Sequence, residues 1–266
     1  IDGTPYQWFL WCGDKNYYCI HAGVDDATSK IVGMFMTENE CLYGYMGMIK
    51  SMYRKYGLPN SFYSDRASIF CVTPRQKDKL SVLEQLQGVH EKRTQFQRIM
   101  DELHINQILA WSPQAKGRVE RMWHTVQDRL PHYFKKHQIR TIEQANLFLE
   151  KYFMDIYNEQ FGKTPADDES FFMKYFDENK LEQILCARFP CKTDHNGQFK
   201  FRGMTFAVIG AKYCACKNIE LCVNEKNLSA CLNGEYYQVR PVDELTDGYD
   251  ELIPKVVRNI IHEALM

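Results

Sequence analysis

The sequence lacks the features that would assign it to a membrane or secreted class. No apolar run approaches the ~18 residues that a membrane-crossing helix needs, so we expect no membrane span and no membrane partner. The first five residues contain no basic start followed by an apolar stretch, which predicts the absence of a signal peptide. The net charge is only −1, so the overall basic excess typical of DNA-binding domains is missing as well.

Paired cysteine motifs are also missing, although the chain has ten cysteines. They are scattered through a chain without a secretory signal, which favours reduced thiols over disulfides. Cys214, Cys216, Cys222 and Cys231 are close enough in sequence to raise the alternative of a zinc site. They lack the C-x-x-C spacing of structural zinc modules, and Cys214 and Cys216 are expected on one face of a strand. We therefore favour core packing for this group.

Charge is distributed unevenly along the chain, and this matters more than its total. Residues 111–140 contain seven Lys or Arg against two acids, whereas residues 243–266 contain six acids against two bases. A basic stretch that also carries carboxylates suits a substrate with a phosphate backbone. Hydrophobic residues make up 45% and charged residues 25%, as in ordinary globular domains.

The first 165 residues alternate between strand and helix signals. Short aromatic and β-branched runs predict strands, apolar residues at helical spacing predict helices, and residues 66–92 form a polar insertion. A capping-box pattern begins the last helix at Thr141, and Pro131 is expected to close the helix before it. The expected strands are 6–12, 17–24, 30–37, 61–64 and 105–110, and the expected helices are 38–56, 94–103, 118–130 and 141–158.

The pattern changes after residue 165. Short helical segments are expected over 166–185, followed by several strands over 189–242, which suggest a small β-barrel. Asp194-His195-Asn196-Gly197 is a hairpin signal, because Asn-Gly suits a turn that needs positive φ. A closing amphipathic helix is expected over 249–265. The predicted parts are thus a core (1–165), a helical connector (166–185), a barrel-like domain (186–245) and a C-terminal helix (246–266).

Three carboxylates lie where chain order can bring them together. Asp2 is the second residue, Asp65 ends a predicted strand, and Glu120 lies in the first turn of a helix. Three clustered carboxylates repel one another unless cations neutralise them, and Mg²⁺ prefers oxygen ligands. Two such ions ~3.5–4 Å apart support an in-line displacement at phosphorus. Singly, each acid has a second interpretation: a solvated terminal residue, a turn acid and a helix-dipole acid.

The sequence around Glu120 resembles a known family. The run Trp111-Ser112-Pro113-Gln114-Ala115-Lys116-Gly117-Arg118-Val119-Glu120-Arg121-Met122 is similar to the active-site loop and helix of retroviral integrases. Further runs resemble one group of bacterial insertion-sequence transposases, the ISNCY type of the retroviral integrase superfamily. These runs are Asp2-Gly3-Thr4-Pro5, Val24-Asp25-Asp26-Ala27-Thr28, Tyr63-Ser64-Asp65-Arg66, Ser112 to Arg121 and Gln127-Asp128-Arg129-Leu130. The resemblance spans roughly residues 1–165.

This resemblance implies a fold, an activity and a cofactor. The fold is α/β and RNase H-like, with a mixed five-stranded sheet flanked by helices and followed by the small barrel-like domain. The activity is that of a DDE transposase that hydrolyses phosphodiesters at element ends and transfers the 3′-OH into target DNA. Asp2, Asp65 and Glu120 are the implied catalytic and metal residues, with two Mg²⁺ or Mn²⁺ ions.

The resemblance also implies DNA as the partner, a homo-oligomer on DNA, and a bacterial cytoplasmic, nucleoid-associated location. Residues Asp65 and Glu120 are 55 positions apart, more than in retroviral integrases, and the polar insertion accounts for the difference. Because Asp2 is the second residue, we expect a fragment whose complete protein has upstream helix-turn-helix segments. Two alternatives stay open: an RNase H-like nuclease that cuts without joining, and a non-catalytic DNA-binding or regulatory remnant of a transposase.

Several polar residues near Glu120 are candidates for DNA contact. Helical spacing places His124 and Gln127 on the face of Glu120, where they would touch a DNA terminus. A solvated helix face remains the alternative for the basic residues, and Asp25 and Asp26 are interpreted as turn formers, with Asp26 also considered near the metals. The candidates for DNA contact are Gln114, Lys116, Arg118, Arg121, His124 and Gln127.

Overall fold

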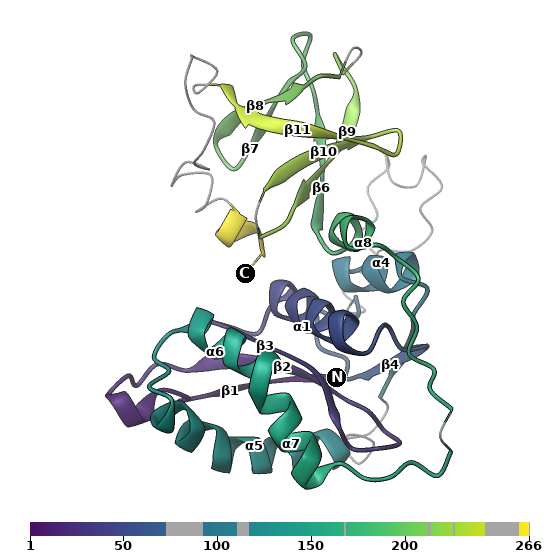
Figure 1. Cartoon of the computed structure of the whole chain (residues 1–266). Helices are drawn as coiled ribbons and strands as arrows, with labels where there is room; N and C mark the ends of the chain where they lie inside the picture. Colours follow the sequence, from purple (N-terminus) through teal and green to yellow (C-terminus); the bar gives the residue numbers. More distant parts are fainter. Residues whose placement is uncertain are drawn as a thin grey trace. The chain divides into compact units, whose positions relative to one another are not determined.

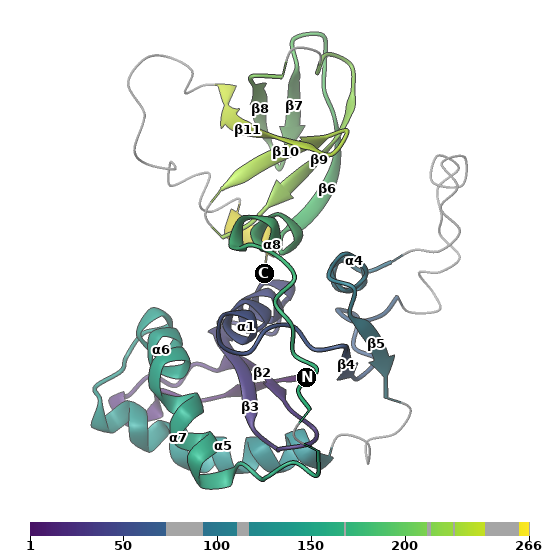
Figure 2. The same cartoon turned by 45° about the vertical axis from the view of Figure 1, so that its right-hand side comes forward.

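The protein divides into two compact units, Ile1–Asp177 and Glu178–Met266, which are described separately (Figures 1 and 2). The computed structural model describes residues 1–72, 93–110, 117–167, 169–211, 214–225, 227–242 and 261–265. Within these ranges, no helix is both long enough and apolar enough to cross a membrane.

An antiparallel three-stranded sheet forms the centre of the first unit. It consists of β1 (Asp2–Tyr6), β2 (Tyr18–Val24) and β3 (Ile31–Thr37) in the order β1-β2-β3, with Asp2 opposite Ala22. The predicted strand at 6–12 is wrong, because the chain leaves the sheet after Tyr6 and forms a 3-10 helix at Leu10–Cys12. Trp8 and Phe9 are consecutive and both fully buried in the same core cluster, which the alternating faces of a strand do not allow.

Helix α1 (Leu42–Lys55) packs closely on one face of this sheet. A Cβ atom at Gly44 would lie 2.1 Å from the ring of His21, and one at Gly47 would lie 2.4 Å from the ring of Phe35. Glycine at these two positions therefore allows the helix backbone to approach the sheet.

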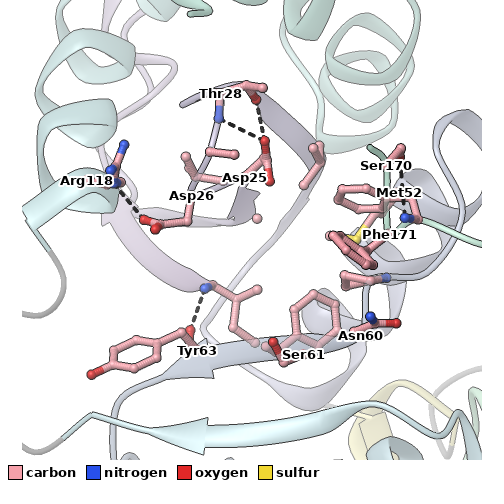
Figure 3. Close-up of a pocket in the computed structure, with 18 of the residues that line it drawn as sticks. Asp25, Asp26, Thr28, Met52, Asn60, Ser61, Tyr63, Arg118, Ser170 and Phe171 are labelled. Carbon is pink, nitrogen blue, oxygen red and sulfur yellow. Dashed lines mark hydrogen bonds and ion pairs between the residues drawn. The ribbon is translucent and has the colours of Figure 1, made fainter. Parts of the chain in front are cut away.

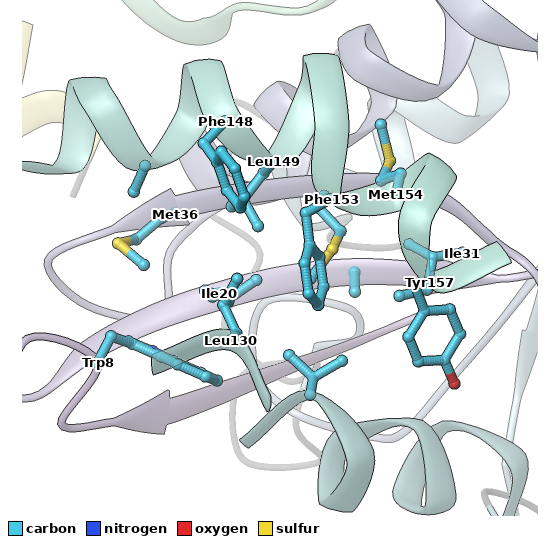
Figure 4. Packing of buried hydrophobic residues seen from close by; sticks show 14 of the residues in the cluster. Trp8, Ile20, Ile31, Met36, Leu130, Phe148, Leu149, Phe153, Met154 and Tyr157 are labelled. Atoms are coloured by element: carbon cyan, nitrogen blue, oxygen red, sulfur yellow. The ribbon is translucent and has the colours of Figure 1, made fainter. Parts of the chain in front are cut away.

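The opposite face is covered by helix α5 (Gly117–Lys136) and by a continuous helical rod. The rod consists of α6 (Ile142–Phe148), a π-helical segment (Leu149–Phe153) and α7 (Met154–Phe161), so a helix over 141–158 is confirmed. Figure 4 shows Phe148, Phe153 and Tyr157 of this rod directed toward Ile20 and Ile31 of the sheet. The sheet thus lies between two helical layers.

The predicted end of a helix at Pro131 is wrong, because Pro131 lies inside α5. Leu130 and Phe134 on either side of it are completely buried in the core. Burial of these side chains offsets the hydrogen bond that a proline inside a helix removes, so α5 continues to Lys136.

Two further strands form a separate parallel pair, β4 (Ser61–Ser64) with β5 (Asn106–Leu109). Helix α4 (Gln95–Glu102) precedes β5 and begins with a capping box at Thr94. The described residues of the first unit contain five strands, the first at Asp2–Tyr6 rather than at 6–12, and they pair as a group of three and a group of two instead of one mixed sheet. The main-chain nitrogen of Ile1 donates a hydrogen bond to the carbonyl of Tyr63 (2.7 Å), so the start of β1 lies beside β4. Residues 73–92 of the predicted insertion lie outside the described residues.

The second unit is a six-stranded antiparallel sheet that nearly closes on itself. It follows helix α8 (Glu178–Ile184) and has the order β6-β9-β10-β11-β8-β7. Its edge strands β6 and β7 approach each other, with the rings of Phe189 and Phe201 5.0 Å apart, as the predicted small barrel requires. The strands are β6 (Ala187–Lys192), β7 (Gln198–Phe201), β8 (Met204–Ile209), β9 (Asn218–Val223), β10 (Leu228–Leu232) and β11 (Glu235–Pro241).

Three local predictions for this unit have different outcomes. The turn before β7 is confirmed, with Gly197 at φ +74° and its N–H bonded to the carbonyl of Asp194. Cys214 and Cys216 do not lie on a strand: they precede β9, and Cys216 has a positive φ of 55°. Of the predicted helix at 249–265, only residues 261–265 are described, and they are helical.

Candidate functional site

Asp2, at the start of β1, is half-buried and faces helix α5. It lies on the same side of the sheet as its cross-strand neighbour Ala22, which belongs to the core cluster under α5. Its Oδ2 accepts a hydrogen bond of 3.1 Å from the indole Nε1–H of Trp123. The sequence interpretation did not include Trp123. The signal in the sequence was the position of Trp123 three residues after Glu120, which places its indole N–H donor one helical turn from Glu120.

Asp65 follows the last residue of β4 and is half-buried. Its Oδ1 accepts the backbone N–H of Ala67 (2.9 Å), so it also shapes the turn that follows the strand. The hydrogen bond between Ile1 and Tyr63 places the residue before Asp2 next to the strand that leads to Asp65. These two acids therefore lie at the ends of neighbouring segments.

Glu120 lies in the first turn of α5 and is exposed. Trp123, in the next turn, contacts Asp2, so Glu120 lies one helical turn from a residue that contacts the first acid. The three predicted acids thus come from three elements that meet at one end of β1.

No described group of three His, Cys, Asp or Glu side chains is arranged to hold a metal ion. The Ile1–Tyr63 and Trp123–Asp2 hydrogen bonds join the elements that carry the three acids, but the acids themselves are not gathered into one set of ligands. As a set of donors they are all carboxylates, which is the ligand chemistry that Mg²⁺ and Mn²⁺ accept.

The face of β1 away from α5 carries a buried tyrosine. Tyr45 of α1 donates a hydrogen bond from its hydroxyl to Oε1 of Glu40 (2.6 Å). Burial, together with the negative charge of Glu40 and a smaller effect of Asp2, raises the pKa of Tyr45 well above its usual range. Tyr45 therefore stays neutral and places no phenolate beside the acids.

The candidate DNA contacts have different surroundings. Nε of Arg118 lies 2.6 Å from Oδ1 of Asp26 in an ion pair at the start of α5. Gln127 is turned toward the sheet, where its Nε2 donates to Oγ1 of Thr4 (3.2 Å). Arg121 and His124 are exposed. Gln114 and Lys116 lie outside the described residues.

Asp25 and Asp26 have distinct roles in the turn between β2 and β3. Asp25 accepts hydrogen bonds from the backbone N–H and the hydroxyl of Thr28, which confirms it as a turn former. Asp26 points outward and pairs with Arg118, so this turn is tied to the first turn of α5, where Glu120 also lies (Figure 3).

A cleft of about 700 Å³ opens next to these elements, as the close-up in Figure 3 shows. Its walls come from the end of β2, the turn after it, β4, the first turn of α5 and residues 165–172. Representative lining residues are Val24, Asp26, Ser61, Tyr63, Arg118 and Phe171. The cleft gives solvent access to the region between the β1–β3 sheet and the β4–β5 pair.

Sequence comparison relates this chain to bacterial transposases and confirms the relationship that the motifs predict. The chain is 35% identical over 189 residues to "Putative transposase y4bF" of Sinorhizobium fredii, an alignment that covers 71% of this chain and 38% of that protein. It is 32% identical over 162 residues to "Transposase for insertion sequence IS1202" of Streptococcus pneumoniae, covering 61% and 32%. The alignments span about a third of the length of these relatives.

No family model matches the chain. Among solved structures, it is similar to a chain of the simian T-cell lymphotropic virus intasome in complex with PP2A regulatory subunit B56 gamma. The TM-score is 0.41 at 12% sequence identity, over 89% of this chain and 76% of that chain.

Proposed function

We propose that this chain is the catalytic region of a DDE transposase in the retroviral integrase superfamily. The observation that carries the proposal is the meeting of three carboxylate-bearing elements at one end of β1. The Ile1–Tyr63 hydrogen bond ties β1 to the strand before Asp65, and the Trp123–Asp2 hydrogen bond ties β1 to the helix of Glu120. The relationship to transposases supports the same assignment.

In this proposal the first unit is RNase H-like, and its strands are two parts of one mixed five-stranded sheet. The hydrogen bond from Ile1 to Tyr63 supports this, because it joins the β1 side of the three-stranded sheet to β4. The proposed domains are a core over 1–165, a connector over 166–185, a barrel over 186–245 and a C-terminal helix over 246–266.

The proposed reaction has two steps. Water first hydrolyses a phosphodiester at the element end and leaves a free 3′-OH, and that 3′-OH then attacks a phosphodiester of target DNA. Each step displaces one oxygen at phosphorus, so no protein–DNA covalent intermediate forms, and DNA found covalently attached to the chain would contradict the proposal.

Asp2, Asp65 and Glu120 would hold two Mg²⁺ or Mn²⁺ ions, with Asp2 shared between the two. When bound, such ions activate the attacking oxygen and stabilise the leaving one. The residues of the chain itself supply the carboxylate ligands and their relative placement.

The remaining assignments are part of the same proposal. DNA is the partner, a homo-oligomer forms on DNA because two element ends are handled together, and the location is cytoplasmic and nucleoid-associated. Lys116, Arg118 and Arg121 would contact phosphates, Gln114, His124 and Gln127 would contact the DNA terminus, and the barrel would contact DNA or another subunit.

End cleavage with labelled DNA tests the three acids. We expect Asp2→Asn, Asp65→Asn and Glu120→Gln each to reduce metal-dependent cleavage by several orders of magnitude. Asp128→Asn is the matched control, because Asp128 is an exposed acid on the same helix as Glu120, two turns further on. Equal cleavage by wild type and the Asp65→Asn variant would reject the assignment of Asp65, and no cleavage by either protein despite DNA binding would favour a non-catalytic remnant.

A further inference from the structure

Two side-chain hydrogen bonds fix α5 on β1. Nε1 of Trp123 donates to Asp2, and Nε2 of Gln127 donates to Thr4. Trp123 and Gln127 are four positions apart, about 6 Å along the helix, and Asp2 and Thr4 are two positions apart, about 6.7 Å along the strand. Because the two lengths match, both bonds form without bending either element. The pair therefore sets the register of the helix along the strand.

Trp123 is held firmly enough to orient its partner. Its side chain is 6% exposed and belongs to the core cluster that includes Ile20, Ala22 and Met34 of the sheet. A buried indole N–H usually finds an acceptor, and a carboxylate provides a stronger one than a neutral group. The half-buried Asp2 carboxylate is thus anchored to the packed core.

We infer that Trp123 is a positioning residue for Asp2. It holds Oδ2 of Asp2 in a fixed direction and, through the register it shares with Gln127, it places Glu120 one helical turn away. This inference rests on the proposed transposase activity, because it is about the geometry of the acids that the activity needs. Gln127 then acts toward β1, in addition to its proposed role toward DNA.

The Trp123–Asp2 contact is tested first, without any reaction. The chain has four tryptophans and thus four indole N–H resonances in a ¹⁵N-correlated NMR spectrum. Trp8→Phe, Trp11→Phe and Trp111→Phe assign three of them, and the fourth belongs to Trp123. We expect Asp2→Ala to move the Trp123 resonance and to leave that of Trp8, which donates to the carbonyl of Tyr18, in place. An unmoved Trp123 resonance would overturn the inference.

Kinetics then test the positioning role. Trp123→Phe keeps the aromatic volume but removes the donor, and we expect kcat for end cleavage to fall on the order of 10- to 100-fold, as for partners that orient metal ligands. The KM for DNA should stay within about twofold, because the DNA-contacting side chains are unchanged. Trp8→Phe is the matched control, since it removes a buried indole hydrogen bond from the same core cluster, and it should keep the wild-type kcat.

The outcomes separate this inference from the proposed function. Wild-type cleavage together with an unchanged kcat in folded Trp123→Phe would reject the positioning role alone. Absence of cleavage by the wild type would reject the proposed function, and the positioning role with it. If thermal melting shows that Trp123→Phe does not fold, Thr4→Val replaces it, because this variant removes the acceptor of the Gln127 hydrogen bond and keeps Gln127 itself. A lower kcat at unchanged KM then supports the shared register, and a wild-type kcat rejects it.

Discussion

His21 shows how one buried polar side chain connects three elements. It lies in β2 with no exposed surface, its Nδ1 is 3.3 Å from the carbonyl of Phe35 in β3, and its Nε2 accepts the backbone N–H of Cys41 at the start of α1. Both contacts are made by the neutral ring, with the proton on Nδ1. Burial lowers the pKa of His21 to about 4, which the hydrogen bond to Phe35 opposes in part.

We therefore predict that the chain loses stability as the pH falls from about 6.5 toward 4. In this window the unfolded chain binds a proton at His21 that the folded chain does not bind, so the free energy of unfolding decreases as pH falls. Above about pH 6.5 protonation of His21 costs no stability. Between about pH 6.5 and 4 it lowers the free energy of unfolding by about 3 kcal/mol, because one pKa unit corresponds to about 1.4 kcal/mol. Denaturant unfolding at several pH values measures it.

Two histidine substitutions control this pH experiment. His21→Gln should remove most of the decrease in the free energy of unfolding between pH 6.5 and 4. His132→Gln, at an exposed position of α5, should keep this decrease. The same slope in His21→Gln and wild type would show that other groups cause the pH dependence.

At this scale the sequence motifs single out residues but not the partners of those residues. Asp2, Asp65 and Glu120 were chosen by motif, and the structure places their three elements together. Trp123 and the Asp26–Arg118 pair were missed, because a hydrogen bond from helix to strand depends on the register between them. That register is set by packing between residues far apart in the sequence, which local spacing does not encode.

Two asparagines of the helical rod protect the free edge of β3. Asn146 exchanges two hydrogen bonds with the backbone of Met36, and Asn158 exchanges two with the backbone of Ile31. Asn146 and Asn158 are twelve positions apart, about 18 Å along the helix, and Ile31 and Met36 are five positions apart, about 17 Å along β3. Each side-chain amide thus bonds one backbone N–H and one carbonyl of β3, as a residue of a neighbouring strand would. Fewer backbone groups of this edge are then available for pairing with another chain.

We predict that Asn146→Ala and Asn158→Ala each lower the free energy of unfolding by about 1–3 kcal/mol, because each leaves a backbone N–H and carbonyl unsatisfied. Asn106→Ala, at an exposed position of β5, is the matched control and should change it by less than about 0.5 kcal/mol. Chemical denaturation measures all three. The double variant should also self-associate in sedimentation experiments, and a stable monomeric double variant would contradict the edge-protection role.

Elements were predicted well where the residue types and their spacing are typical of one kind of element. The strands at Ile31–Thr37 and Ser61–Ser64 and the rod after Thr141 are confirmed. The predictions that failed depend on burial rather than on local preference: Trp8 and Phe9 turn the chain inward, and Leu130 and Phe134 carry α5 past Pro131. Pairing of the five strands into groups of three and two was likewise not readable from strand order.

Each of the two units has its own core. In the second unit the rings of Phe199 and Phe206 stack at 5.7 Å, and Leu221 and Ala230 of the neighbouring strands are completely buried. We predict that a fragment of residues 178–266 folds by itself, with dispersed amide resonances and a cooperative thermal transition. A fragment with narrow dispersion and no transition would show that the barrel needs the first unit.

The central claim is that Asp2, Asp65 and Glu120 together support DNA strand transfer, and a joining assay tests it most directly. Labelled duplexes that carry the element ends are incubated with target DNA, Mg²⁺ or Mn²⁺, and either wild type or Asp65→Asn. We predict metal-dependent joined product from wild type and none from Asp65→Asn. Cleaved but never joined ends would point to a nuclease, and equal product from both proteins would contradict the assignment of Asp65.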